Sequence, residues 1–211
     1  MDIIFDLDGT LWDSSHTILK AWKGIFHKYS IEITLNDINY ILGLTNIDII
    51  KWFKMEKGIN KDVAIKVLTE CQKEEIVLIK LEGGTLFPKV GETLKELSKS
   101  NNLYIVSNCQ VGYIEAFLSF YNFNKYFKDF ECAGNTNLSK TENIKIVIER
   151  NTMKNPIYVG DTASDQHASL LNNIPYIYAS YGFGDNKECM YTIDEFQDLK
   201  KLCYNLEKKG N

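Results

Sequence analysis

The sequence has no excess of positive charge and no long apolar run. Its 24 Lys+Arg against 28 Asp+Glu give a formal charge of -4, which repels a phosphate backbone, so no nucleic-acid partner is expected. No run approaches the roughly 18 apolar residues that span a bilayer, so no membrane association is expected either. Because no basic, cleavable leader is evident at Met1, we expect a cytoplasmic protein.

Paired cysteines and clustered histidines are also missing. The five cysteines are odd in number and form no Cys-x-x-Cys pair, which excludes an evident disulfide framework or zinc site. The three histidines show no metal-binding spacing, and the chain contains no internal repeat or low-complexity tract. With 45% hydrophobic residues over 211 positions, the chain is long enough for one domain with a smaller one inserted in it.

Short apolar runs alternate with helical patterns over most of the chain. Such alternation predicts an α/β protein with a doubly wound, Rossmann-like parallel sheet. The expected strands are at 3–5, 103–106, 157–159 and 176–179, and the helical patterns lie at 90–97, 113–118, 144–148, 168–171 and 196–206. We assign residues 1–13 and 85–211 to this catalytic core.

Residues 14–84 interrupt the alternation with a purely helical pattern. Apolar residues at helical spacing follow one another from Ile18 to Tyr29, another helix is expected near Thr34, and a longer one should begin after Asn60 as its N-cap. We therefore predict an inserted helical cap domain. Its return to the core is marked by Gly83-Gly84, which suits a hinge or linker.

The most informative motif is Asp6-Leu7-Asp8-Gly9-Thr10, which directly follows the first apolar run. In an extended chain Asp6 and Asp8 lie on the same side. One carboxylate could attack phosphorus while the other, with a raised pKa, donates a proton to the leaving oxygen. Gly9 would let the backbone turn sharply and approach a ligand. Taken alone, the motif could also be a strand ending in an ordinary turn.

Further polar residues follow the other predicted strands. Asp161 follows 157–159, and Asp165 comes shortly after it. Because ligands bind beyond the carboxyl ends of parallel strands, these side chains should meet Asp6 and Asp8. Several crowded carboxylates require a neutralising cation, and oxygen ligands of this kind suit Mg²⁺.

Ser107-Asn108 and Lys140 are candidate phosphate ligands. Ser107 and Asn108 end the predicted strand at 103–106, where they could bind phosphoryl oxygens or simply form a turn. Lys140 precedes a helix that we expect Thr141 to cap, and it could place a cation beside the phosphate or lie on the surface.

The order D-L-D-G-T-L, S-N, K and G-D-T-x-x-D resembles the four motifs of the haloacid dehalogenase superfamily. The resemblance covers nearly the whole chain. The helical insertion after the first motif is similar to the cap of the phosphoglycolate phosphatase and β-phosphoglucomutase group. Any one motif is weak evidence, whereas all four in this order are specific.

The resemblance implies a Mg²⁺-dependent phosphatase that acts on a small phosphorylated metabolite. Asp6 would form an aspartyl-phosphate and Asp8 would act as general acid and then as base. The implied metal ligands are the Asp6 carboxylate, the Asp8 backbone carbonyl and Asp161, with Asp165 supporting the metal or orienting the lysine. The implied catalytic and phosphate-binding groups besides these are Gly9, Thr10, Ser107, Asn108 and Lys140.

Several alternatives stay open at this stage. A phosphomutase acting on a sugar phosphate shares all four motifs, and a non-catalytic phosphometabolite-binding protein could retain them. A dehalogenase would not need Asp8 or the metal, and a signalling receiver is much shorter and has no cap. The substrate and the choice between monomer and homodimer are not encoded in recognisable motifs.

Two features of the predicted cap bear on the substrate. The segment 41–45 falls where relatives carry a loop that reads the substrate, although Gly43 could simply end a helix. Several cap lysines could meet an anionic substrate, but solvated helix faces explain them equally well; these are Lys20, Lys23, Lys51 and Lys54.

Overall fold

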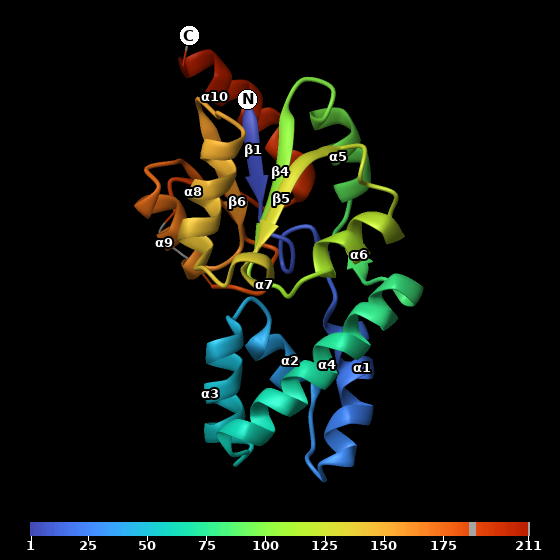
Figure 1. The fold of residues 1–211 in the computed structure, drawn as a ribbon. Coiled ribbons are helices and arrows are strands. Elements are labelled where there is room, and N and C mark those ends of the chain that lie inside the picture. The colour runs from blue at the N-terminus through green and yellow to red at the C-terminus, as the bar shows by residue number, and fades with distance from the viewer. Residues whose placement is uncertain (186–188, 211) are drawn as a thin grey trace.

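The protein is built around a parallel sheet with helices on both faces. The computed structural model describes residues 1–185 and 189–210 (Figure 1). The strands of the main sheet are β1 (Asp2–Phe5), β4 (Asn102–Ser107), β5 (Phe127–Cys132), β6 (Pro156–Gly160), β7 (Tyr176–Ala179) and β8 (Tyr191–Ile193). Their order is β5-β4-β1-β6-β7-β8, and all neighbours are parallel. The chain thus winds from β1 to one side and then to the other, which confirms the predicted doubly wound core.

Helices cover both faces of this sheet (Figure 1). They are α5 (Val90–Leu97), α6 (Tyr113–Phe120), α7 (Ala133–Thr136), α8 (Lys140–Arg150), α9 (Ala163–Leu171), the 3₁₀ helix η1 (Phe196–Asp198) and α10 (Leu199–Gly210). Helices α8 and α9 pack on one face. Strand residues alternate between the faces, since Ile4 belongs to the apolar cluster under α8 and α9 whereas Ile3 and Phe5 belong to the larger cluster on the other face.

Four of the five helices between β1 and β4 form a group at one end of the molecule (Figure 1). They are α1 (Ser15–Lys28), α2 (Leu35–Ile41), α3 (Asn46–Glu56) and α4 (Lys61–Glu82). Their core contains stacked Trp22 and Phe26 rings with Phe53 packed edge-on against both. The expected helix starts are confirmed, because Thr34 forms a capping box and the Asn60 side chain accepts a hydrogen bond from the backbone of Val63.

The two connections to the four helices pair with each other. Strands β2 (Trp12–Asp13) and β3 (Thr85–Leu86) form a short antiparallel ribbon. Beside it, Gly83 ends α4 with a φ of 69°, and the carbonyl of Gly84 accepts a hydrogen bond from the hydroxyl of Tyr121 on the core. The segments by which the chain enters and leaves the four-helix group are therefore held side by side.

Strands β5 and β8 were not predicted. Both are edge strands of the sheet, and their sequences FKDFEC and YTI lack the continuous apolar run of the inner strands. Among the helices of the described residues, none is both long enough and apolar enough to cross a membrane.

Candidate active site

Three inner strands place acidic and hydroxyl groups at one edge of the sheet. Asp6 follows β1, Ser107 ends β4 and Asp161 follows β6, as the sequence predicted. The backbone N–H of Asp6 donates to Val159 (2.9 Å), which fixes the end of β1 against β6. Asp6, Asp161 and Asp165 each present a carboxylate oxygen, and these oxygens lie within 4.8 Å of one another. The predicted convergence of acidic side chains is present for Asp6, Asp161 and Asp165, whereas the carboxylate of Asp8 lies outside this group.

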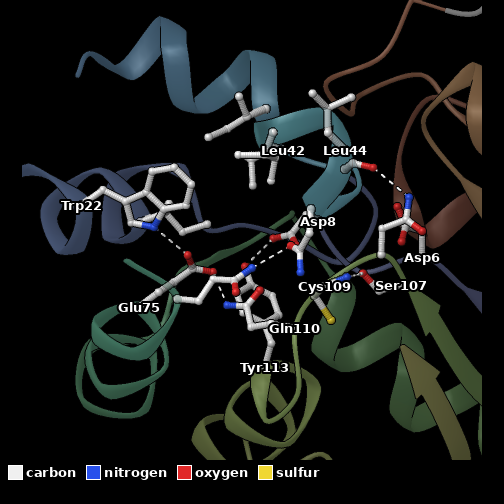
Figure 2. A pocket seen from close by; sticks show the side chains of 17 residues that line it. Asp6, Asp8, Trp22, Leu42, Leu44, Glu75, Ser107, Cys109, Gln110 and Tyr113 are labelled. Carbon is white, nitrogen blue, oxygen red and sulfur yellow. Dashed lines mark hydrogen bonds between the residues drawn. The ribbon is translucent and has the colours of Figure 1, made fainter. Parts of the chain in front are cut away.

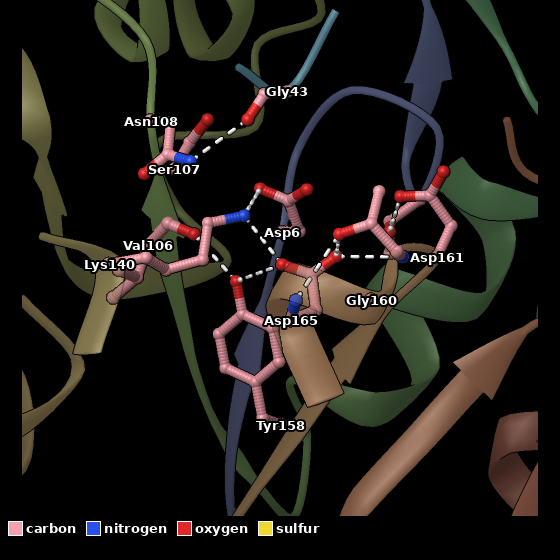
Figure 3. Close-up of polar contacts among 12 residues, drawn as sticks. Asp6, Gly43, Val106, Ser107, Asn108, Lys140, Tyr158, Gly160, Asp161 and Asp165 are labelled. Carbon is pink, nitrogen blue, oxygen red and sulfur yellow. Dashed lines mark hydrogen bonds and ion pairs between the residues drawn. The ribbon is translucent and has the colours of Figure 1, made fainter. Parts of the chain in front are cut away.

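Lys140 is the buried cation of this group (Figure 3). Its Nζ lies 2.5 Å from Asp165 Oδ1 and 3.1 Å from Asp6 Oδ1. Burial favours the neutral amine, but the two carboxylates outweigh it and raise the pKa of Lys140 above its usual value. The side chain is therefore charged and points at Asp6.

The helix that carries Lys140 starts with a capping box. Ser139 accepts a hydrogen bond from the backbone of Glu142, and the Glu142 side chain bonds back to Ser139. The expectation that Thr141 caps this helix was wrong, because Ser139 and Glu142 have the spacing of a capping box. Lys140 consequently occupies the first helical turn and faces the strand ends.

One lysine does not neutralise the carboxylates around it. Burial raises the pKa of Asp6 well above its ordinary value, and Asp165 and Asp161 raise it further against the opposing effect of Lys140. Burial and Asp165 raise the pKa of Asp161 to about 7. The cluster offers oxygen donors alone and has an excess of negative charge. A hard divalent cation such as Mg²⁺ fits both properties.

Asp161 is held by groups from two segments. Its Oδ2 accepts hydrogen bonds from the backbone N–H of Phe183 (2.8 Å) and Gly184 (3.3 Å). Thr10 Oγ1 lies 3.4 Å from its Oδ1, so the hydroxyl of Thr10 faces this carboxylate. Gly9 has a φ of 81°, and a Cβ at this position would collide with the carboxylate of Asp161. Glycine is required here both by conformation and by close approach.

Asp8 occupies a separate environment from the cluster around Asp6. Its Oδ1 accepts hydrogen bonds from Ser14 Oγ (2.6 Å) and the Tyr113 hydroxyl (2.8 Å). Burial raises the pKa of Asp8 to about 6, although both hydrogen bonds act in the opposite direction. Asp8 is thus a carboxyl group that holds its proton in mildly acidic solution, as a proton donor requires.

Ser107 and Asn108 both lie at the site, but their side chains have different surroundings. Ser107 is buried in the lining of the cavity above Asp6. Asn108 Nδ2 donates to the carbonyl of Gly43 (2.9 Å), which links the end of β4 to the loop after α2. Asn108 Oδ1 is buried and has no hydrogen-bond partner among the described residues. Gly43, with a φ of 82°, directly follows Leu42, the C-cap of α2, and its carbonyl reaches the site.

A cavity lies between the strand ends and the four helices (Figure 2). Asp6 and Asp8 form part of its lining on the sheet side, and Trp22, Leu44 and Glu75 are part of its lining on the helical side. Its volume is about 50 Å³, which is room for on the order of four waters. The helices therefore cover Asp6 and Asp8 on this side, and the cavity stays partly open to solvent.

The family assignment follows from the sequence itself. The model of the haloacid dehalogenase-like hydrolases matches residues 3–179, which include every acidic and basic residue of the site. The chain belongs to this family.

Solved structures share the fold of this haloacid dehalogenase-like hydrolase. A haloacid dehalogenase-like family protein from Streptococcus pneumoniae is 22% identical over 97% of each chain, with a TM-score of 0.83. A predicted phosphoglycolate phosphatase from Haemophilus somnus is 18% identical over 96% of this chain and 97% of its own (0.79). CbbY from Rhodobacter sphaeroides in complex with phosphate is 14% identical over 94% and 95% (0.78). No curated protein gave a significant match.

Several groups that shape the site of this hydrolase were not predicted. Ser14 and Tyr113 contact Asp8, and Glu75 lines the cavity from α4. Neither Tyr113 nor Glu75 stands in a recognisable motif, because each lies within an ordinary helical pattern. The loop at Phe183-Gly184 did carry a signal, since a glycine-rich segment directly follows a predicted strand, where ligand-binding loops occur.

Proposed function

We propose that this chain is a Mg²⁺-dependent phosphatase that hydrolyses a small phosphorylated metabolite through an aspartyl-phosphate on Asp6. The observation that carries the proposal is the pairing of a buried Asp6 with charged Lys140 at 3.1 Å. Lys140 opposes the burial and the carboxylate repulsion that raise the pKa of Asp6, and an ionised carboxylate beside a cation, facing a cavity, is equipped to attack a phosphoryl group. The hydrolase family of the chain agrees with this chemistry.

Asp6 attacks phosphorus, and the neighbouring groups neutralise the phosphoryl oxygens. Lys140 supplies a positive charge on one side of Asp6, and Asp165 holds Lys140 in place. The Ser107 hydroxyl and the backbone of Gly9 and Asn108 supply hydrogen bonds to the transferring group. Phosphoryl transfer depends chiefly on such positioning and charge compensation.

Asp8 exchanges the protons of the reaction. In its protonated form it donates to the leaving oxygen, and as a carboxylate it then accepts a proton from the water that hydrolyses the aspartyl-phosphate. Ser14 and Tyr113 fix the orientation of its carboxyl group through one oxygen.

The proposed Mg²⁺ ligands are the carboxylates of Asp6 and Asp161 and the backbone carbonyl of Asp8, with Asp165 beside them. When bound there, Mg²⁺ would supply positive charge to the phosphoryl oxygens. Thr10 and the Phe183-Gly184 backbone orient Asp161 for this role. Thr10 therefore assists phosphate binding through Asp161.

Residues 14–84 act as a cap over a core formed by residues 1–13 and 85–211. The β2–β3 ribbon is the place where a hinge would lie, because it carries both connections. Closure of the cap excludes bulk water from the phosphoryl group. The complex of CbbY with phosphate supports phosphate binding by this architecture.

Phosphatase activity is favoured over phosphomutase activity by the lining of the cavity. A mutase that acts through a sugar bisphosphate must bind a second phosphate away from the nucleophile. No Lys, Arg or His occurs among the described residues that line the cavity. A second phosphate would therefore lack a cationic partner.

The proposal is tested with p-nitrophenyl phosphate in the presence and absence of Mg²⁺. We expect release of p-nitrophenol with Mg²⁺ and a loss of at least about 100-fold in EDTA, because the carboxylates around Asp6 then repel the phosphate. Excess Mg²⁺ added after EDTA should restore the rate. Undiminished hydrolysis in EDTA would remove the metal from the mechanism.

The pH dependence of kcat/KM should report Asp8. The pKa of Asp8 is raised from 3.8 to about 6, so Asp8 stays protonated and can donate its proton below that pH. The value of kcat/KM for an alkyl phosphate should therefore fall as the pH rises through about 6. Tyr113→Phe removes a hydrogen bond that lowers this pKa, so the alkaline limb should move upward by about half to one pH unit. Tyr204→Phe, at an exposed tyrosine, is the control. If the alkaline limb of Tyr113→Phe lies at the same pH as that of the wild type, Asp8 is not the proton donor that the profile reports.

A further inference from the structure

Glu75 is a buried acidic residue that the proposed mechanism does not use. It lies on α4, is 4% exposed and lines the cavity opposite the strand ends (Figure 2). Its Oε2 accepts a hydrogen bond from the indole Nε1 of Trp22 (2.7 Å), and its Oε1 accepts one from Nε2 of Gln110 (2.8 Å). These contacts hold the carboxylate in one orientation between the cap and the core.

The carboxylate of Glu75 has more hydrogen-bond acceptor positions than it has donors. A carboxylate offers about four acceptor positions, and among the described residues only Trp22 and Gln110 donate hydrogen bonds to it. Asn108 Oδ1, in the same cavity lining, is a second buried acceptor without a partner among the described residues. The carboxylate of Glu75 thus keeps acceptor positions that no donor among the described residues fills.

In its ionised form Glu75 has no compensating charge beside it. Burial raises its pKa to about 7, and neither of its hydrogen-bond donors is cationic. The charged residues among the described cavity lining are Asp6, Asp8 and Glu75, all of them acidic. None of the cap lysines considered as anion ligands lines the cavity. Two of them form ion pairs at exposed positions, Lys20 with Glu82 and Lys51 with Asp48.

A buried carboxylate of this kind is costly for the fold. An apolar residue on this face of α4 would avoid the desolvation of a charge, so packing alone does not explain a glutamate here. A ligand group that donates hydrogen bonds or carries positive charge would satisfy the carboxylate. A ligand carboxylate or second phosphate would instead be repelled by it.

We propose that Glu75 determines the substrate class of this site, and that the leaving group is short and carries a hydroxyl or ammonium group that donates to Glu75. The inference rests on the proposed phosphatase function. The cavity measures about 50 Å³, so a short leaving group fits it better than a sugar or a nucleotide. Phosphoglycolate, whose leaving group ends in a carboxylate, is a poor substrate on this basis.

Three phosphate monoesters of nearly equal size test the proposal with the wild-type protein. Phosphoethanolamine, 2-hydroxyethyl phosphate and phosphoglycolate differ mainly in the terminal group, which is an ammonium, a hydroxyl or a carboxylate. We expect kcat/KM for at least one of the first two to exceed that for phosphoglycolate by at least about tenfold. The better of those two identifies the donor as ammonium or hydroxyl. A wild-type preference for phosphoglycolate overturns the proposal.

Glu75→Gln removes the charge at nearly constant volume, and the readout is the ratio of kcat/KM between substrates. The ratio for the preferred ester over phosphoglycolate should fall by about tenfold if the donor is ammonium and by about threefold if it is hydroxyl. Glu75→Asp keeps the charge and should retain the wild-type ranking. An unchanged ratio in Glu75→Gln means that the residue is structural, and it overturns the proposal.

Glu74→Gln is the matched control, because Glu74 is the exposed neighbour of Glu75 on the same helix. It should leave all the rates and ratios unchanged. The wild-type ranking does not depend on how well any variant folds. If the wild type does not hydrolyse p-nitrophenyl phosphate with Mg²⁺, the phosphatase function itself fails. If it does but prefers the carboxylate ester, only the role of Glu75 fails.

Discussion

Asp6→Asn is expected to lower phosphatase kcat by at least about 10⁴-fold, because the amide cannot attack phosphorus. The protein should still fold. Asn has nearly the same volume, and the change relieves the repulsion that raises the pKa of Asp6 beside Asp161 and Asp165. Lys140 keeps its partner Asp165 at 2.5 Å, so no buried cation is left unpaired. The melting temperature should stay within about 5 °C of the wild type.

Two measurements together check this expectation. The rate of p-nitrophenyl phosphate hydrolysis measures the chemistry. Intact mass after mixing with acetyl phosphate, with each variant combined with Asp8→Asn so that a phosphorylated form accumulates, measures whether a phosphoryl group is attached. Asp62→Asn is the control, since Asp62 is exposed in the first turn of α4, and it should retain both properties. Normal turnover or normal phosphorylation of Asp6→Asn would exclude Asp6 as the nucleophile.

The sheet and its active edge were predictable because the informative residues are local in sequence. The inner strands are buried on both faces, so they are continuous apolar runs, and each ends in a polar residue that must lie at the carboxyl edge. The positions of Asp6, Ser107 and Asp161 follow from this pattern. The edge strands β5 and β8 have one exposed side, so their residues do not stand out from a loop.

The environment of each carboxylate could not be predicted in the same way. Asp8 and Asp161 occur in similar motifs, yet one accepts hydrogen bonds from Ser14 and Tyr113 and the other from backbone N–H groups after β7. These partners come from distant parts of the chain and are fixed only by tertiary packing. The same holds for Glu75, which meets Gln110 across the junction between the four helices and the core.

Asp8→Asn separates the two chemical steps according to the leaving group. The amide cannot donate a proton to a leaving alkoxide or accept one from water, so kcat for an alkyl phosphate should fall by about 10² to 10⁴-fold. Acetyl phosphate has a good leaving group that needs little protonation, and it should still transfer its phosphoryl group to Asp6. Hydrolysis of the resulting aspartyl-phosphate lacks a base and should be slow.

A phosphorylated form of Asp8→Asn should therefore accumulate with acetyl phosphate and not with an alkyl phosphate, as intact mass would show. Asp13→Asn is the matched control, because this nearby residue accepts a hydrogen bond from the backbone of Ser15 and does not line the cavity. It should turn over both substrates without accumulating a phosphorylated form. If Asp8→Asn discharges the aspartyl-phosphate as fast as the wild type, another group is the base. The buried, hydrogen-bonded carboxyl of Asp8 would then be structural.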